Sequence, residues 1–199
     1  MLIAVLSGFL LALIAPVICS VAREWSGWTL ALLPATLFTW FASHLPAVMA
    51  DGAQVISYPW FPSLDIHLSF LVDGLSLMFA LLISGIGTFI LIYAGSYLKG
   101  HPAIARFYVV MLAFMASMLG VVLSDNLITL FVFWELTSIT SYMLIGFDHE
   151  DMNARRSALQ GLFVTVAGGL ALLAGLLMLG TITGSYALSE VLEIGRAHV

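Results

Sequence analysis

Four long stretches without a Lys, Arg, Asp or Glu restrict most what this chain can fold into. They cover residues 1–22, 74–98, 107–124 and 157–189. Each approaches or exceeds the roughly 20 apolar residues with which a helix crosses a bilayer. Of the 199 residues, 62% are hydrophobic and 9% are charged, whereas soluble domains carry about 25% charged residues. Because a polar shell is missing, the chain is predicted to be a membrane protein.

The pattern predicts an all-α polytopic membrane protein with about six transmembrane helices. We expect these helices at residues 2–22, 28–49, 71–97, 104–123, 127–147 and 157–182. Residues 50–70 form the longest connection, between the second and third helices. Apolar and polar residues alternate near its end, which indicates a short strand or hairpin.

The basic residues predict how the chain is oriented. Five of the six Lys and Arg residues follow the first, third and fifth expected helices: Arg23, Lys99, Arg106, Arg155 and Arg156. The loops after the second and fourth helices contain no Lys or Arg. Since loops rich in Lys and Arg stay in the cytoplasm, we expect the amino terminus and the hairpin to face outward.

Glu135 is a charged residue within an expected transmembrane helix, where an apolar residue would suffice to span the membrane. It is the only formally charged residue in 127–147. A carboxylate at that depth costs roughly 3 kcal/mol on insertion scales, so it marks a functional candidate, most simply a proton or cation site. The residues alone leave a second interpretation equally open, a structural carboxylate that is hydrogen-bonded inside the bundle.

Other acidic residues lie near helix ends. Asp73 precedes the third helix, where it can cap the helix or form a mouth for protons or ions. The segment of Asp148, His149, Glu150 and Asp151 follows the fifth helix and could collect protons or cations at a channel opening. It could equally be a solvated loop whose charge Arg155 and Arg156 balance.

The motifs of several protein classes are missing. The sequence has no Gly-rich phosphate loop, HExxH, paired CxxC or Gly-x-Ser-x-Gly. His44 and His67 have no metal-ligand spacing to a partner. We therefore expect no cofactor and no metal. The net charge of −5 gives no sign of nucleic-acid binding.

The last six residues, 194–199, read IGRAHV. They match one translated frame of a common sequencing adapter. We expect the natural sequence to depart from this chain after Glu193.

Residues 133–138 (FWELTS) and 141–147 (SYMLIGF) resemble the fifth helix of the antiporter-like subunits of respiratory complex I and of Mrp-type cation/proton antiporters. Residues 71–76 (LVDGLS) resemble the start of the third helix of the same family. Residues 165–169 read TVAGG, where the large complex I subunit tends to carry Arg and Asp. The resemblance is therefore strongest to the A subunits of the multisubunit Na⁺/H⁺ antiporters.

The resemblance implies a mechanism in which Glu135 faces a lysine on a later, broken helix beyond residue 199. Burial disfavours the charged form of a carboxyl group, and a nearby cation favours it. Separating the pair would therefore move a proton along a hydrated path. Residues 1–66 would hold the first two helices and the outer loop, and 67–193 would begin a truncated proton-translocating domain.

The resemblance also implies the partners and the location. These are other membrane subunits of a hetero-oligomeric complex, Na⁺ and H⁺ as substrates, and the bilayer of a bacterial plasma membrane. The protein would be no redox catalyst but a secondary transporter subunit. A proton-pumping subunit of complex I or of a membrane hydrogenase is the alternative, and neighbouring genes would discriminate between the two.

Overall fold

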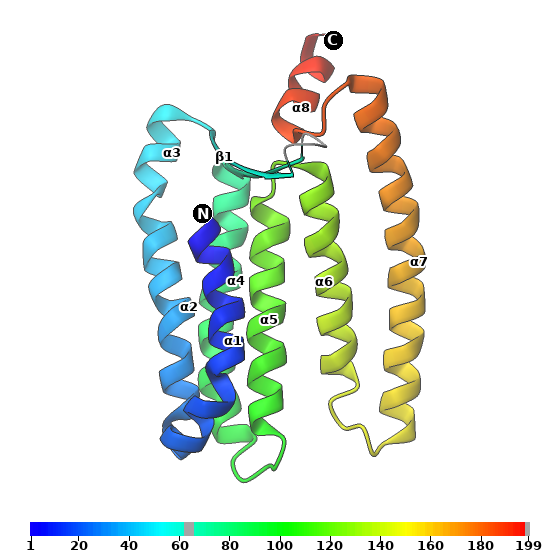
Figure 1. The fold of residues 1–199 in the computed structure, drawn as a ribbon. Coiled ribbons are helices and arrows are strands. Elements are labelled where there is room, and N and C mark those ends of the chain that lie inside the picture. Colours follow the sequence, from blue (N-terminus) through cyan, green and yellow to red (C-terminus); the bar gives the residue numbers. More distant parts are fainter. Residues whose placement is uncertain (62–65, 198–199) are drawn as a thin grey trace.

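Long helices packed side by side dominate the computed structural model, which describes residues 1–61 and 66–197 (Figure 1). The helices of 18 or more residues in these ranges are α1 Leu2–Ala22, α2 Ser26–Ser43, α4 Gly74–Tyr97, α5 Ile104–Leu123, α6 Leu127–Ile145 and α7 Met152–Thr183. Five stretches of the described chain are long and apolar enough to cross a membrane. The first, Leu2–Ala50, contains both α1 and α2, which the 3-10 turn η1, Arg23–Trp25, folds back on each other. The predicted class, an all-α polytopic membrane protein, is confirmed.

Several predicted helix boundaries were wrong, and the sixth helix, expected from residue 157, begins at Met152. The helix expected at 28–49 ends at Ser43, and a separate short helix, α3 Leu45–Asp51, follows His44. Pro46 lies in the first turn of α3 and has no N–H to continue the hydrogen-bond ladder of α2. The helix expected from residue 71 begins at Gly74, because the residues up to Val72 pair as a strand.

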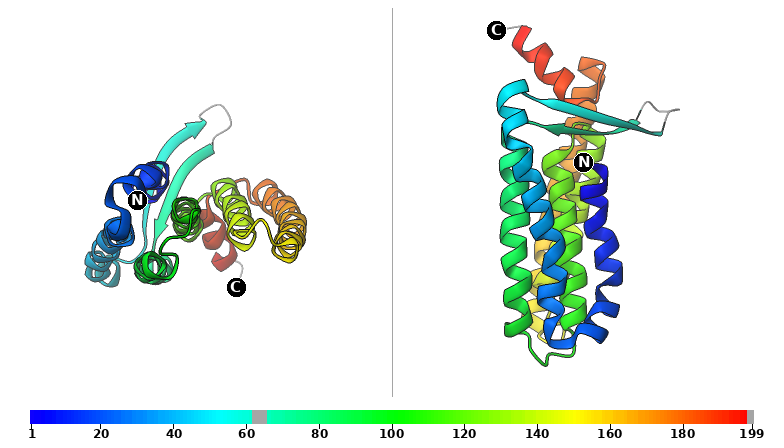
Figure 2. Two further views of the ribbon diagram at one scale, coloured as in Figure 1. Left: turned by 90° about the horizontal axis from the view of Figure 1, so that it is seen from below. Right: turned by 90° about the vertical axis from the view of Figure 1, so that its left-hand side faces the viewer.

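A two-stranded antiparallel hairpin follows α3. Its strands are β1 Gln54–Phe61 and β2 Ile66–Val72, with Gln54 opposite Val72 and an irregularity between Pro59 and Phe61. The hairpin extends across the end of the bundle at which the amino terminus lies (Figure 2). Residues 62–65 and the side chains of Trp60 and His67 lie outside the described part.

Buried apolar side chains form two clusters between the helices. One lies toward the hairpin and includes Phe41, Phe70 and Phe133. The other includes Leu91 and Tyr108. Close approach of the helices depends on small residues. For example, a Cβ built on Gly120 of α5 would lie 2.3 Å from the ring of Phe133 in α6.

Residues 84–88, which include two glycines, lie in the continuous helix α4. Gly85 faces Phe38 of α2, and Gly87 faces Met115 of α5. These glycines therefore serve packing.

Helix α7 lies at one edge of the bundle and packs against α6 (Figure 1). Its buried residues are Ala158, Gly169 and Gly180, eleven positions apart, so they lie on one face after three turns each. Ala167 and Ala171 are exposed in the described structure. The short helix α8, Leu188–Ala197, follows α7. The prediction that 194–199 is foreign stays a prediction.

Candidate functional site

Glu135 lies near the middle of α6, about 12 Å along the helix axis from Leu127. Its side chain is half-buried and points at α7. The atom Oε1 is shielded from solvent and has no hydrogen-bond partner among the described residues. It lies only 2.0 Å from where a Cβ on Gly169 would stand. One carboxylate oxygen of Glu135 therefore occupies space that exists because residue 169 has no side chain.

The hydroxyl groups near Glu135 in sequence bond to their own helix. Thr137 donates to the carbonyl of Trp134 at 2.7 Å, and Thr140 donates to the carbonyl of Leu136 at 2.7 Å. Ser138 also donates to the carbonyl of Trp134, at 3.3 Å. These bonds are the usual way in which hydroxyl residues fit inside a helix. These three hydroxyl groups thus donate to backbone carbonyls of α6, and none of the three bonds is to the carboxyl group of Glu135.

Asp73 is the amino-terminal cap of α4. Its Oδ1 accepts a hydrogen bond from the N–H of Ser76 at 2.8 Å, and the N–H of Asp73 donates to the Ser76 hydroxyl at 2.8 Å. This reciprocal capping box satisfies two backbone donors at the helix start. The capping interpretation of Asp73 is thereby sufficient to explain its position.

The residues Asp148, His149, Glu150 and Asp151 are exposed in the loop between α6 and α7. Asp151 caps α7, because its carboxylate accepts from the N–H of Asn153 at 2.8 Å. His149 Nδ1 lies 3.4 Å from a guanidinium nitrogen of Arg106, and that guanidinium also donates to the carbonyl of Phe147. This segment is therefore exposed, and Arg106 holds it to α5.

The structure does not bring the predicted site residues together. The loop of Asp148 and Asp151 lies at one end of the bundle, and Asp73 lies at the other (Figure 1). Glu135 lies between the two ends. No group of three or more His, Cys, Asp or Glu in residues 1–61 and 66–197 is arranged to hold a metal ion.

The basic residues that follow the first, third and fifth expected helices lie at one end of the bundle. The connections α1–α2, α4–α5 and α6–α7 all lie at one end of the bundle (Figure 1). These connections and the adjoining helix turns carry Arg23, Lys99, Arg106, Arg155 and Arg156. Lys99 pairs with Glu24 at 2.9 Å, and both side chains are largely exposed. Arg196, in the segment predicted to be foreign, lies in α8 at the other end.

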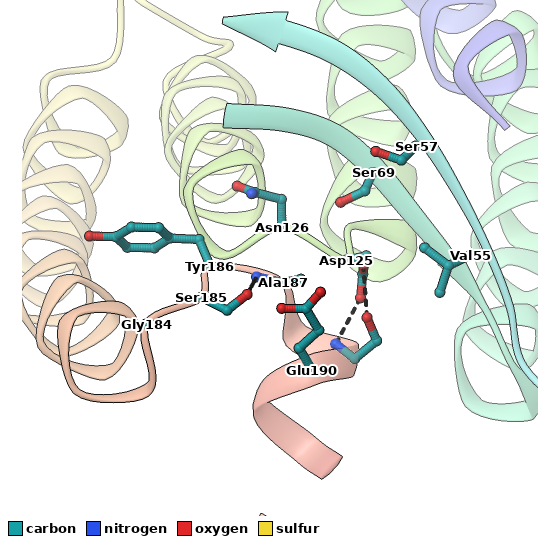
Figure 3. A pocket seen from close by; sticks show the side chains of 11 residues that line it. Val55, Ser57, Ser69, Asp125, Asn126, Gly184, Ser185, Tyr186, Ala187 and Glu190 are labelled. Carbon is teal, nitrogen blue, oxygen red and sulfur yellow. Dashed lines mark hydrogen bonds between the residues drawn. The ribbon is translucent and has the colours of Figure 1, made fainter. Parts of the chain in front are cut away.

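Sequence reasoning missed a buried acid at the turn between α5 and α6. Asp125 is only 2% exposed. Its carboxylate accepts from the N–H and the hydroxyl of Ser189 in α8, at 2.9 and 3.1 Å (Figure 3). Its own N–H donates to the carbonyl of Ser69 in β2. The available signal was a polar Ser-Asp-Asn triplet that directly joins two apolar helices.

A polar pocket of about 560 Å³ surrounds this acid, between the hairpin, the turn and α8. The side chain of Tyr186 points away from it (Figure 3), with its ring against Gly180 of α7. Asn126 caps α6 by accepting from the N–H groups of Ile128 and Thr129. The turn therefore ties α6, β2 and α8 together, and the acid at its centre is already satisfied by hydrogen bonds.

Two family models match the chain. One, described as the N-terminus of chain 5 of NADH-ubiquinone oxidoreductase (complex I), matches residues 60–108. The other, described as the transmembrane region of NADH:quinone oxidoreductase and Mrp antiporters, matches residues 124–198.

Curated relatives point the same way. The A subunit of the Na⁺/H⁺ antiporter of Alkalihalophilus pseudofirmus is 43% identical over 192 residues, 96% of this chain and 24% of that protein. The chain belongs to the family of Mrp-type antiporter A subunits. The probable A/B subunit of a K⁺/H⁺ antiporter of Rhizobium meliloti is 41% identical over 96% of this chain and 19% of that protein. This member of the family thus spans about a quarter or less of the length of these relatives.

Solved structures agree on the fold. A structure of the Mrp complex from a Dietzia species superimposes with a TM-score of 0.81 at 33% identity, over 94% of this chain and 20% of that chain. The archaeal membrane-bound sulfane sulfur reductase, a respiratory complex, gives a TM-score of 0.74 at 21% identity over 99% of this chain and 30% of that chain. The second likeness concerns the fold alone.

Proposed function

We propose that this family member is part of the A subunit of a multisubunit monovalent cation/proton antiporter, and that Glu135 takes part in proton translocation. The observation that carries the proposal is the shielded, unpaired Oε1 of Glu135 at mid-helix. Burying an unpaired polar oxygen is unfavourable, and a structural carboxylate would have been given donors. A proton relay instead needs a carboxyl group whose partners come and go.

The relay would work by changing what faces the carboxyl group. In the antiporter-like subunits that the sequence resembles, a lysine on a later helix pairs with the acid that corresponds to Glu135. Lys99 is the only lysine of this sequence, and it pairs with Glu24 at the end of the bundle. The partner of Glu135 would therefore come from chain beyond residue 199. While the cation is close, it favours the charged carboxylate. When it withdraws, the carboxyl group takes up a proton.

Access for protons or cations through Asp73 and through the exposed segment at residues 148–151 stays a prediction. Asp73 and Asp151 already serve as helix caps. Asp148, His149 and Glu150 are exposed in the loop between α6 and α7. We infer that any access role at this end is carried by these three residues, beside the basic side chains of α5 and α7.

The proposal places the protein in a bacterial plasma membrane, among other membrane subunits, with Na⁺ or another monovalent cation and H⁺ as substrates. The relatives carry both Na⁺/H⁺ and K⁺/H⁺ in their names, so selectivity among monovalent cations is a separate question. A proton-pumping subunit of complex I is the second candidate, favoured by the family model that matches residues 60–108. Identity of 43% to an antiporter protein, almost end to end along this chain, favours the first.

The test is cation-dependent proton flux in everted membrane vesicles that carry the full-length subunit in its complex. Glu135→Gln keeps the size and shape of the side chain but cannot carry a proton. We expect it to abolish the flux while the complex still assembles.

Glu24→Gln is the matched control, because Glu24 is exposed and its surface ion pair is worth about 1 kcal/mol or less. We expect this variant to transport normally. Retained cation-dependent flux in Glu135→Gln would contradict the proposal.

A further inference from the structure

Gly169 of α7 lies against the carboxyl group of Glu135. An ideal Cβ on Gly169 would lie 2.0 Å from Oε1, 3.2 Å from Cδ and 3.8 Å from Oε2 of Glu135. Real side chains do not approach so closely, so any larger residue here must displace the carboxyl group. Gly169 is also one of three buried residues on α7. The carboxyl group is the far end of a flexible side chain, so a methyl group at position 169 would move it out of the space that it occupies.

The requirement for glycine is local to this position. A Cβ on Gly168 or on Gly175 would meet nothing within 4 Å in the described structure. Gly168 and Gly169 are neighbours in sequence, and only the second faces α6. The helix therefore offers a matched pair of glycines that differ in one respect, contact with Glu135.

We propose that Gly169 is a positioning residue for Glu135, which forms a slot that holds Oε1 against the backbone of α7. The inference rests on the proposed function of Glu135 and adds a determinant on a second helix. Because Oε1 is shielded and unpaired, the slot leaves Oε2 as the oxygen that a partner cation or water can reach. The slot thereby determines that a cation or water approaches the carboxyl group of Glu135 at Oε2 and not at Oε1.

The test is a double-mutant cycle on transport by the assembled complex. Gly169→Ala adds one methyl group in the slot, and we expect it to lower cation-dependent proton flux about tenfold. Gly168→Ala should leave the flux unchanged. In a Glu135→Asp background the carboxyl group is one methylene shorter and clears the methyl group. The same Gly169→Ala change should then cost less than about twofold, so the two sites are coupled.

A general packing role for Gly169 makes the opposite prediction. If Gly169→Ala lowers the flux equally in both backgrounds, or not at all, the positioning role is wrong. A second readout covers the case in which Glu135→Asp is itself inactive, namely the rate at which a hydrophobic carbodiimide labels Glu135, followed by mass spectrometry. We expect Gly169→Ala to speed labelling several-fold and Gly168→Ala to leave it unchanged. Equal rates in all three proteins would overturn the inference.

The outcome is separable from that of the proposed function. Normal flux in Glu135→Gln would remove the relay, whereas the labelling rates would still report whether the slot holds the carboxyl group. Conversely, loss of flux in Glu135→Gln together with unchanged flux and labelling in Gly169→Ala would keep the relay and remove the slot.

Discussion

Two acidic residues of this chain show how a structural carboxylate differs from a candidate relay. Asp73 accepts a hydrogen bond from the N–H of Ser76 at the start of α4, and its own N–H donates to the Ser76 hydroxyl. Glu135 lies in mid-helix with a shielded oxygen that has no partner in the described structure. A satisfied cap contributes stability by itself, but an unsatisfied buried oxygen does not. The hydrogen-bond partners of a carboxylate, and not only its depth in the membrane, therefore distinguish a structural role from a relay role.

The capping role of Asp73 can be tested with two substitutions. Asp73→Ala removes the cap and should destabilise the protein by about 1 kcal/mol. Asp73→Asn keeps a good capping group but removes the charge, so it should be close to wild type in both thermal unfolding and transport. If Asp73→Asn instead loses transport as strongly as Asp73→Ala does, Asp73 acts as a mouth for ions and not only as a cap.

Much of the residue-scale picture could be predicted, and its limits have a physical reason. Glu135 is recognisable because a lone charge in an apolar run is costly wherever the helix packs. The roles of Gly169 and Asp125 were not predicted, because each depends on a contact with a different element. Asp125 meets Ser189, 64 positions later. No local pattern reports which face of α7 turns toward α6.

At the scale of helices, the positions of the membrane-spanning helices can be predicted from composition. The points at which a helix ends depend on single residues. Helix α5 was predicted at 104–123 and occupies Ile104–Leu123. The helix expected at 28–49 breaks near Pro46, and the alternation before Asp73 produces β2. Hydropathy averaged over a window of residues is hardly changed by one proline, so it does not predict where the helix breaks. The packing between helices depends on glycines such as Gly120, because the ring of Phe133 occupies the space next to it.

The contact between α5 and α6 makes a stability prediction. Gly120→Ala would place a methyl group into the Phe133 ring, and we expect destabilisation of about 1–3 kcal/mol from overpacking. Thermal unfolding of the assembled protein in detergent would show a lower Tm. Gly175→Ala, where a Cβ meets nothing within 4 Å, serves as the control and should not lower the Tm. Equal effects of the two changes would mean that the close α5–α6 contact is not present.

At the scale of the whole molecule, the two ends of the bundle differ in charge. The five basic residues from Arg23 to Arg156 lie at the end of the α6–α7 loop, and the hairpin lies at the other end (Figure 1). The rule that basic loops stay inside predicts a cytoplasmic location for the first end. The hairpin and the amino terminus would then face outward.

This orientation is testable with single cysteines in intact cells. The sequence has one cysteine, so a Cys19→Ala background leaves none. In that background, Val55→Cys on the exposed face of β1 should react with a membrane-impermeant maleimide added outside. Glu150→Cys in the α6–α7 loop should react only after the cells are opened. The reverse pattern would invert the orientation and contradict the prediction from the basic residues.

If Glu135 is the proton relay, it gains and loses a proton as the complex exchanges cations. The most direct measurement is infrared difference spectroscopy of the assembled full-length complex, recorded with and without the transported cation. We predict a carboxyl C=O band that appears and disappears with the cation and that is missing in Glu135→Gln. A cation-dependent carboxyl band that persists unchanged in Glu135→Gln, or the lack of any such band in an actively exchanging wild-type complex, would contradict a relay role for Glu135.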